Sequence, residues 1–151
     1  MEVSFESESE DKSQDRIDLL LYHLKKRKLK FYEAKDFTNS EIRAESGKKP
    51  KVVSQISRYR KQLDSSVKRA HIIEQYGCYI KIINELFLPD YPIERPTEID
   101  PEPCLLIFGF DDDQRKGRLK KNVETLRSYG IKVYTKGDMS KVKIEQLWNA
   151  K

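Results

Sequence analysis

Features that mark several classes of protein are missing from this chain. Its apolar runs all fall short of the roughly eighteen residues needed for a membrane-spanning helix. It has only two cysteines in 151 residues, Cys78 and Cys104, and these form no Cys-x-x-Cys pair. With only His23 and His71 as further ligands, a structural zinc site or a disulfide framework is not expected, so both cysteines should be buried free thiols.

Two motifs of phosphate and ester chemistry are also missing. No Gly-x-x-x-x-Gly-Lys phosphate loop and no Gly-x-Ser-x-Gly nucleophile elbow occurs in the chain. The first five residues carry one acid and no base, and they lack the basic, apolar and small-residue stretches of a secretory signal. We therefore expect a cytoplasmic protein whose function uses neither of these two motifs.

Charge is distributed unevenly along the chain. The formal net charge is +5, but residues 1–15 hold six acids against one lysine, so this segment carries −5 and the remainder +10. The acidic segment 1–15 should be either a mobile tail or a remnant first strand at residues 3–5. Residues 16–151 have the length of a single domain. Their positive charge suits a polyanion such as a nucleic acid, although lysine-rich surfaces also serve solubility alone.

Hydrophobic patterning predicts an α/β domain with a central mixed sheet, a hairpin at one side and helices on both faces. Strands are expected at 16–22, 29–37, 104–110 and 131–135, and helices at 51–63, 66–87, from just after 111–113 to about 126 or 129, and around Trp148. The run 104–110 is apolar throughout, so it should be central. The helix at 66–87 has apolar residues that should pack at helical spacing: Ile72, Ile73, Tyr76, Tyr79, Ile80, Ile83 and Leu86.

Two acids and a lysine stand on the first two of these strands. Asp18 lies near the start of the first strand, and the period of two in the next strand puts Glu33 and Lys35 on one face. Because a turn joins the strands, the three side chains can converge at one end of a hairpin. Mg²⁺ prefers oxygen ligands and takes only one or two carboxylates from a protein. Asp18 and Glu33 could therefore hold Mg²⁺ or Mn²⁺, and Lys35 could orient water or offset phosphate charge.

In order and spacing, these residues resemble the PD-(D/E)XK (restriction-endonuclease-like) nuclease superfamily, whose signature is an acid at a strand start followed by Glu-x-Lys. The helix at 51–63 contains Gln55 and Tyr59, which share a helical face and are similar to the Q-x-x-x-Y element of the RecB-type branch. The resemblance implies a restriction-endonuclease-like core, metal-dependent cleavage of phosphodiester bonds, most simply in DNA, and a role for Gln55 and Tyr59 in holding substrate and ordering the site.

Basic residues near the motif suggest a path for DNA. One group forms the hairpin turn, and the other lies on the helix at spacings of seven and three, hence on one face. We expect both groups to contact phosphates: Lys25, Lys26, Arg27 and Lys28 in the turn, and Lys51, Arg58 and Lys61 on the helix.

Several alternatives stay open. The same fold could serve a non-catalytic nucleic-acid-binding module or a structural subunit of a nuclease assembly. Residues 111–113 are three consecutive aspartates that could bind Mg²⁺, as after strands in other phosphoryl-transfer domains, or could cap the next helix.

The superfamily usually has a helix before its first strand that can contribute another glutamate, and little room for one is left here. Three explanations are possible: the chain is part of a longer protein, a second copy or another partner completes the domain, or the site works with fewer acids. Glu8 or Glu10 could also fill the role.

Overall fold

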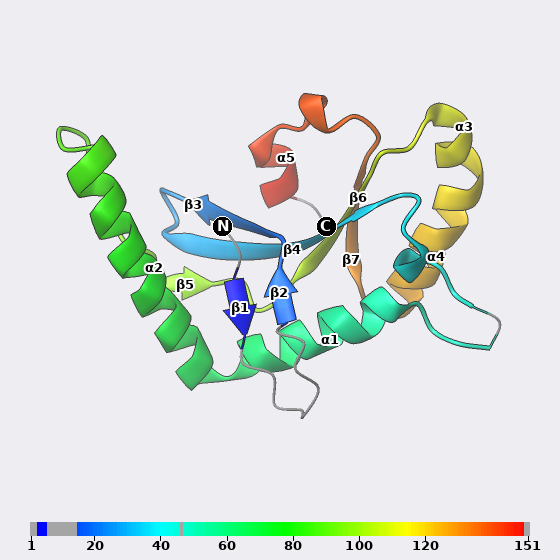
Figure 1. Cartoon of the computed structure of the whole chain (residues 1–151), viewed down its shortest axis with the longest axis horizontal. Helices are drawn as coiled ribbons and strands as arrows, with labels where there is room; N and C mark the ends of the chain where they lie inside the picture. Colours follow the sequence, from blue (N-terminus) through cyan, green and yellow to red (C-terminus); the bar gives the residue numbers. More distant parts are fainter. Residues whose placement is uncertain (1–2, 6–14, 46, 150–151) are drawn as a thin grey trace.

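A mixed five-stranded sheet forms the centre of the molecule (Figure 1). The computed structural model describes residues 3–5, 15–45 and 47–149. β3 and β4 form an antiparallel hairpin, whereas β4, β6 and β7 run parallel to one another, and the short β5 pairs with the first residues of β4. The strand order is β3-β4-β6-β7, with bounds Leu19–His23 (β3), Lys28–Asp36 (β4), Glu98–Ile99 (β5), Cys104–Phe108 (β6) and Lys132–Lys136 (β7). The expected α/β class and the central place of β6 are confirmed.

The first expected strand is divided at Asp18. Its beginning, β2 (Asp15–Ile17), pairs with β1 (Val3–Phe5) in a separate antiparallel ribbon, and β3 begins only at Leu19. Asp18 occupies the bend where the chain leaves one ribbon and joins the other sheet. The prediction of one continuous strand was therefore wrong, because a run of apolar residues does not reveal a change of pairing partner.

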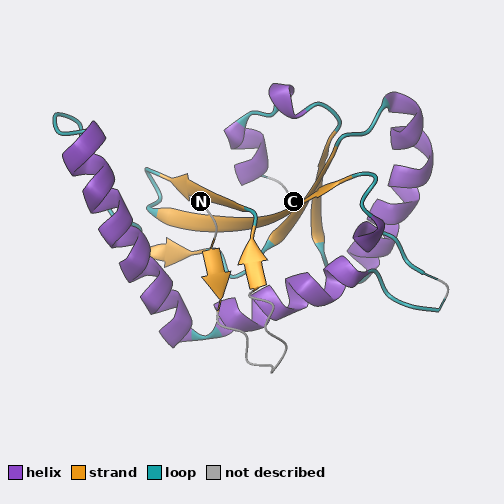
Figure 2. Cartoon of the chain, viewed as in Figure 1, coloured by secondary structure: helices purple, strands orange, loops and turns teal. Residues whose placement is uncertain are grey.

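Helices cover both faces of the sheet, but unequally (Figure 2). One face packs against three helices and the other against one short helix: α1 (Lys51–Asp64), α2 (Ser66–Phe87) and α4 (Lys120–Ser128) on the first face, and α5 (Ile144–Trp148) on the second. Alternation along the strands supplies both cores, since Leu105 faces α1 and α4 while Leu106 faces α5. No helix within the described ranges is long and apolar enough to cross a bilayer.

The aspartates after β6 begin a helix. Asp111 accepts a hydrogen bond from the Gln114 backbone at 2.7 Å, and the Gln114 side chain accepts one from the Asp111 backbone. This capping box starts α3 (Asp112–Gln114), which continues through the π-helical turn η2 (Arg115–Leu119) into α4. The capping interpretation of residues 111–113 is thus confirmed.

Two expectations of burial were wrong. In α2 only Ile72, Tyr76 and Ile80 are buried, whereas Tyr79 is 47% and Leu86 67% exposed. The helix is longer than the sheet edge that it covers, so its final turns have no strand beneath them (Figure 1). Cys104 is buried in β6 as expected, but Cys78 lies exposed on α2.

Candidate active site

Glu33 on β4 is a buried carboxylate with several polar partners. Its side chain is 1% exposed. Oε1 accepts a hydrogen bond from Gln55 Nε2 at 2.7 Å and forms an ion pair with Lys35 Nζ at 2.8 Å. Oε2 lies 3.2 Å from the Tyr59 hydroxyl. Because burying a charge without partners is costly, these contacts are what allow a carboxylate in the core.

The alternation of β4 and the turn of α1 bring these groups together. Glu33 and Lys35 lie on the face that meets α1, whereas Tyr32 faces the other way and donates a hydrogen bond to the Leu147 carbonyl of α5. Gln55 and Tyr59 are one helical turn apart, and Gln55 Nε2 also lies 2.8 Å from the Tyr59 hydroxyl. The residues that the sequence pattern singled out therefore form one connected network.

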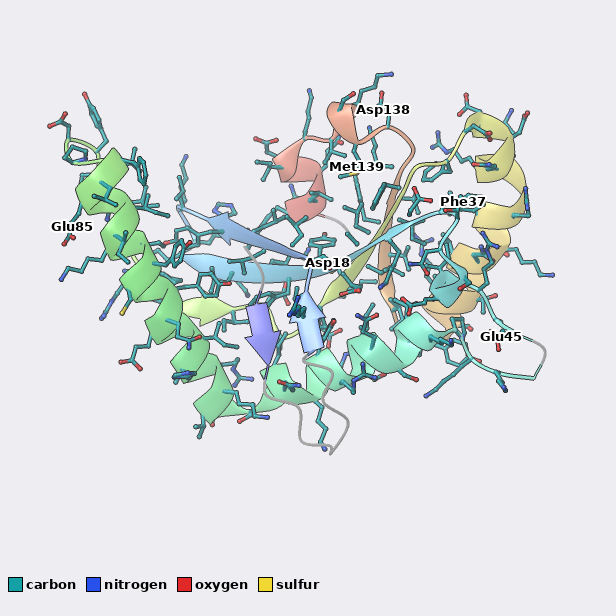
Figure 3. All side chains as sticks on the ribbon, in the orientation of Figure 1. Asp18, Phe37, Glu45, Glu85, Asp138 and Met139 are labelled. Atoms are coloured by element: carbon teal, nitrogen blue, oxygen red, sulfur yellow. The ribbon has the colours of Figure 1, made fainter. Side chains whose placement is uncertain are left out.

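Asp18 reaches the same place from the bend between β2 and β3 (Figure 3). Its Oδ2 accepts a hydrogen bond from the Ala34 backbone N–H at 2.9 Å, which fixes the carboxylate against β4 between Glu33 and Lys35. Burial raises the pKa of Glu33, and the nearby negative charge of Asp18 raises it further, while hydrogen bonds from Lys35 and Tyr59 act in the opposite direction. The two carboxylates are therefore close enough to influence each other.

Lys35 is held between two acids. Its side chain is 13% exposed, and Nζ lies 2.8 Å from both Glu33 Oε1 and Glu41 Oε2. Burial alone would lower the pKa of Lys35, but the hydrogen bonds and charges of Glu33 and Glu41 outweigh it and raise that pKa. Lys35 is thus a fixed positive charge beside the carboxylates.

These residues line an open cleft of about 560 Å³ between β4 and α1. Its walls also include Arg16, Glu41, Lys51, Ser54 and Arg58. With Lys35, the cleft has four basic side chains, set against the acids Asp18, Glu33 and Glu41. A phosphate group entering this space would meet these cations, while of the three acids only Glu33 is fully buried, at 1% exposure.

The two expected groups of basic residues have different places. Lys51 and Arg58 line the cleft, and Lys61 follows on the same helix without lining it. The turn lies at the closed end of the hairpin, where His23 pairs with Lys28, about 16 Å along β4 from Glu33. Arg27 and Lys28 there form ion pairs with Glu94 and Glu98, at 3.0 and 3.6 Å. The structure therefore does not bring the turn residues to the cleft: Lys25, Lys26, Arg27 and Lys28. The cleft lies toward the open end of the hairpin, and the turn is at the opposite end.

Sequence patterns missed three residues of the cleft, namely Arg16, Glu41 and Ser54, which precedes Gln55 on α1. Arg16 could have been found, since it precedes Asp18 by two positions in an extended segment and should share its face. Glu41 belongs to η1 (Ser40–Ile42), a three-residue helix whose path no periodicity indicates. The candidates Glu8 and Glu10 lie outside the described residues.

Asp18 and Glu33 suit a hard divalent cation by the chemistry of their donor set. Both offer carboxylate oxygens, and Mg²⁺ commonly takes only one or two of these and keeps several waters. Across residues 3–5, 15–45 and 47–149, no three His, Cys, Asp or Glu side chains converge into a metal-binding group. A cation here would therefore depend on these two carboxylates together with water.

Comparison of the chain with family models, with curated proteins and with solved structures finds no significant match. A functional proposal for this chain therefore depends on the geometry of the cleft and on the order of its residues along the chain.

Proposed function

We propose that this protein is a Mg²⁺- or Mn²⁺-dependent deoxyribonuclease with a restriction-endonuclease-like core. One observation carries the proposal: five residues in the order of the nuclease signature meet in a single cleft with basic walls, namely Asp18, Glu33, Lys35, Gln55 and Tyr59. Each is a separate match of residue type, and only the fold brings them together. If charged side chains had met here by chance, we would not expect a buried carboxylate, Glu33, that is hydrogen-bonded to both Gln55 and Tyr59.

Each residue has a role that follows from its contacts. Asp18 and Glu33 would hold the cation, which when bound polarises a phosphoryl oxygen and makes a water molecule more acidic. Gln55 and Tyr59 fix the orientation of the Glu33 carboxylate through their hydrogen bonds. Lys35 places positive charge where the negative charge of a cleaved phosphate increases.

Binding of the polyanion falls to the basic walls of the cleft. Arg16, Lys51 and Arg58 line it beside the carboxylates, and none of these side chains needs a particular base to attract a phosphate. We therefore expect affinity for DNA that depends strongly on salt and only weakly on sequence.

The test is incubation of the purified protein with linear and circular DNA, with and without Mg²⁺. Linear and circular substrates also distinguish cleavage at ends from internal cleavage. Cleavage that requires Mg²⁺ and is lost in Asp18→Asn supports the proposal. The matched control is Glu45→Gln, which removes an acid from an exposed loop residue apart from Asp18 (Figure 3). Equal activity of Asp18→Asn and Glu45→Gln would refute the site.

A second candidate function is a non-catalytic nucleic-acid-binding module. The observation that favours it is the ion pair between Lys35 and Glu33, which already neutralises the buried carboxylate. In such a module the acids and the lysine would serve only to stabilise the fold. DNA binding that is unaffected by Mg²⁺, with no cleavage of either substrate, would identify this function instead.

A further inference from the structure

The contact between Lys35 and Glu41 is unexplained by the nuclease signature. Glu41 Oε2 lies as close to Lys35 Nζ as Glu33 Oε1 does, at 2.8 Å. An ammonium group has three N–H donors, and carboxylates from two different segments thus engage two of them. Glu41 is also part of the cleft wall.

The segment that presents Glu41 is tightly held. Asn39 Oδ1 accepts a hydrogen bond from the Glu41 backbone N–H at 2.8 Å, and the next residue, Ile42, is fully buried in the core. The Arg43 guanidinium donates to the carbonyls of Phe37 and Thr38, at 3.2 and 3.1 Å. Anchors on both sides of Glu41 therefore fix its backbone, and the short segment 37–43 places a carboxylate over the end of β4.

The position of Glu41 matters because a cation held by Glu33 would compete with the Lys35 ammonium for the same carboxylate. Both are positive, and Oε1 of Glu33 is bonded to Lys35 in this structure. With Glu41 at 2.8 Å, the ammonium would keep a carboxylate partner if Glu33 bound a cation. Without Glu41, the only carboxylate in contact with Lys35 among the described residues would be Glu33, and the lysine would compete with the cation for it.

We propose that Glu41 is a positioning residue, which retains the Lys35 ammonium at the edge of the cleft so that Glu33 can accept a divalent cation. This inference rests on the proposed nuclease function. It assigns to Glu41 an effect on metal affinity that acts through Lys35, and it gives the segment 37–43 a role beyond connecting β4 to α1.

The experiment is calorimetric titration of Mn²⁺ into the full chain and its variants. Glu41→Gln should weaken Mn²⁺ binding by about tenfold, the size typical of residues that orient metal ligands. In the Lys35→Ala background, the same Glu41→Gln change should alter the affinity by less than about twofold, because the competing ammonium is gone. Glu45→Gln removes an equal charge from the neighbouring loop and should leave affinity unchanged. Glu41→Asp keeps the carboxylate and should retain most of the affinity. Circular dichroism spectra and urea midpoints check that each variant is folded.

The possible results separate the two proposals. A similar loss of Mn²⁺ affinity with and without Lys35 would show that Glu41 acts on the cation directly, which overturns the positioning role. Unchanged affinity in both backgrounds would overturn it too. No Mn²⁺ binding by the unsubstituted protein would overturn the proposed nuclease function itself, and the role of Glu41 with it.

Discussion

Lys35 and Glu33 differ in what their removal should do, although they are only two positions apart. Glu33 is a proposed metal ligand, whereas Lys35 contacts the ligand without being one. Substituting each residue in turn should therefore separate the effect on metal binding from the effect on the proposed cleavage.

Lys35→Ala should slow cleavage strongly, by about a hundredfold or more, since it removes a fixed positive charge from the cleft. Mn²⁺ binding should persist or become tighter, because the ammonium no longer occupies Glu33 Oε1. Cleavage rates and calorimetric titration of the same preparation measure the two effects. Loss of metal binding in a folded variant would mean that Lys35 supports the site structurally.

At the scale of elements, the strand β4 ends in a hydrogen-bonded turn. The Asp36 carboxylate accepts from the Thr38 backbone N–H at 2.8 Å and from the Thr38 hydroxyl at 2.6 Å. These bonds hold the pKa of Asp36 below its ordinary value. The turn leads into the segment that holds Glu41, so an ordered turn helps to keep Glu41 in place at the site.

Asp36 should make folding stability depend on pH in the acidic range. Because its folded-state pKa is lowered, its contribution is present above the unfolded-state pKa and is lost as the pH falls through the folded-state value. Urea midpoints of the parent protein and of Asp36→Asn, compared from about pH 6 to pH 3, should converge at the acidic end. Parallel curves over this whole range would exclude Asp36 as the source.

Two glycines offer a matched comparison of close packing. A Cβ on Gly137, just after β7, would lie 2.4 Å from the Phe110 backbone oxygen, whereas a Cβ on Gly117 in η2 would meet no atom within 4 Å. Gly137→Ala should therefore destabilise the fold by about 1–3 kcal/mol, the usual cost of overpacking. Gly117→Ala should be neutral or stabilising by up to about 1 kcal/mol, as expected in a helix. Chemical denaturation measures both, and equal effects would contradict this packing argument.

Most elements could be predicted from the sequence because each has a clear local pattern. The helix α2 was placed at its observed bounds, and β6 was identified as central from an unbroken apolar run. Local patterns could not show how far one element extends beyond the element that it packs against. The exposure of Leu86 in the final turn depends on where the sheet ends, which periodicity within α2 does not contain.

At the scale of the whole molecule, the candidate site was predictable where residues are spaced regularly on an element. The helical period puts Gln55 and Tyr59 on one face of α1, and in the structure both contact Glu33. Glu41 was missed because the path of an irregular segment places it beside Lys35. The basic turn was placed near the site only because its charges are close in sequence, and the hairpin separates them from Glu33.

The position of the cleft also predicts how DNA binding should respond to salt. Neutralising Lys51 and Arg58 should reduce the slope of log affinity against log salt by roughly 0.7 to 0.9 for each phosphate that the cleft no longer binds. Lys25 and Lys26, at the far end of the hairpin, provide the control pair and should change the slope much less. Fluorescence anisotropy over a salt series measures both slopes. An equal reduction from the two pairs would show only diffuse attraction, and the path through the cleft would have to be abandoned.

The buried Glu33 carboxylate is the group on which the proposed metal-dependent nuclease site depends most. The most direct measurement compares DNA cleavage by the parent protein and by Glu33→Gln in the presence of Mg²⁺, with DNA affinity measured in parallel. The parent should cleave, and Glu33→Gln should lose cleavage by about a thousandfold or more while binding DNA equally or more tightly, because a ligand and a negative charge are gone. Full cleavage by folded Glu33→Gln protein would contradict the claim.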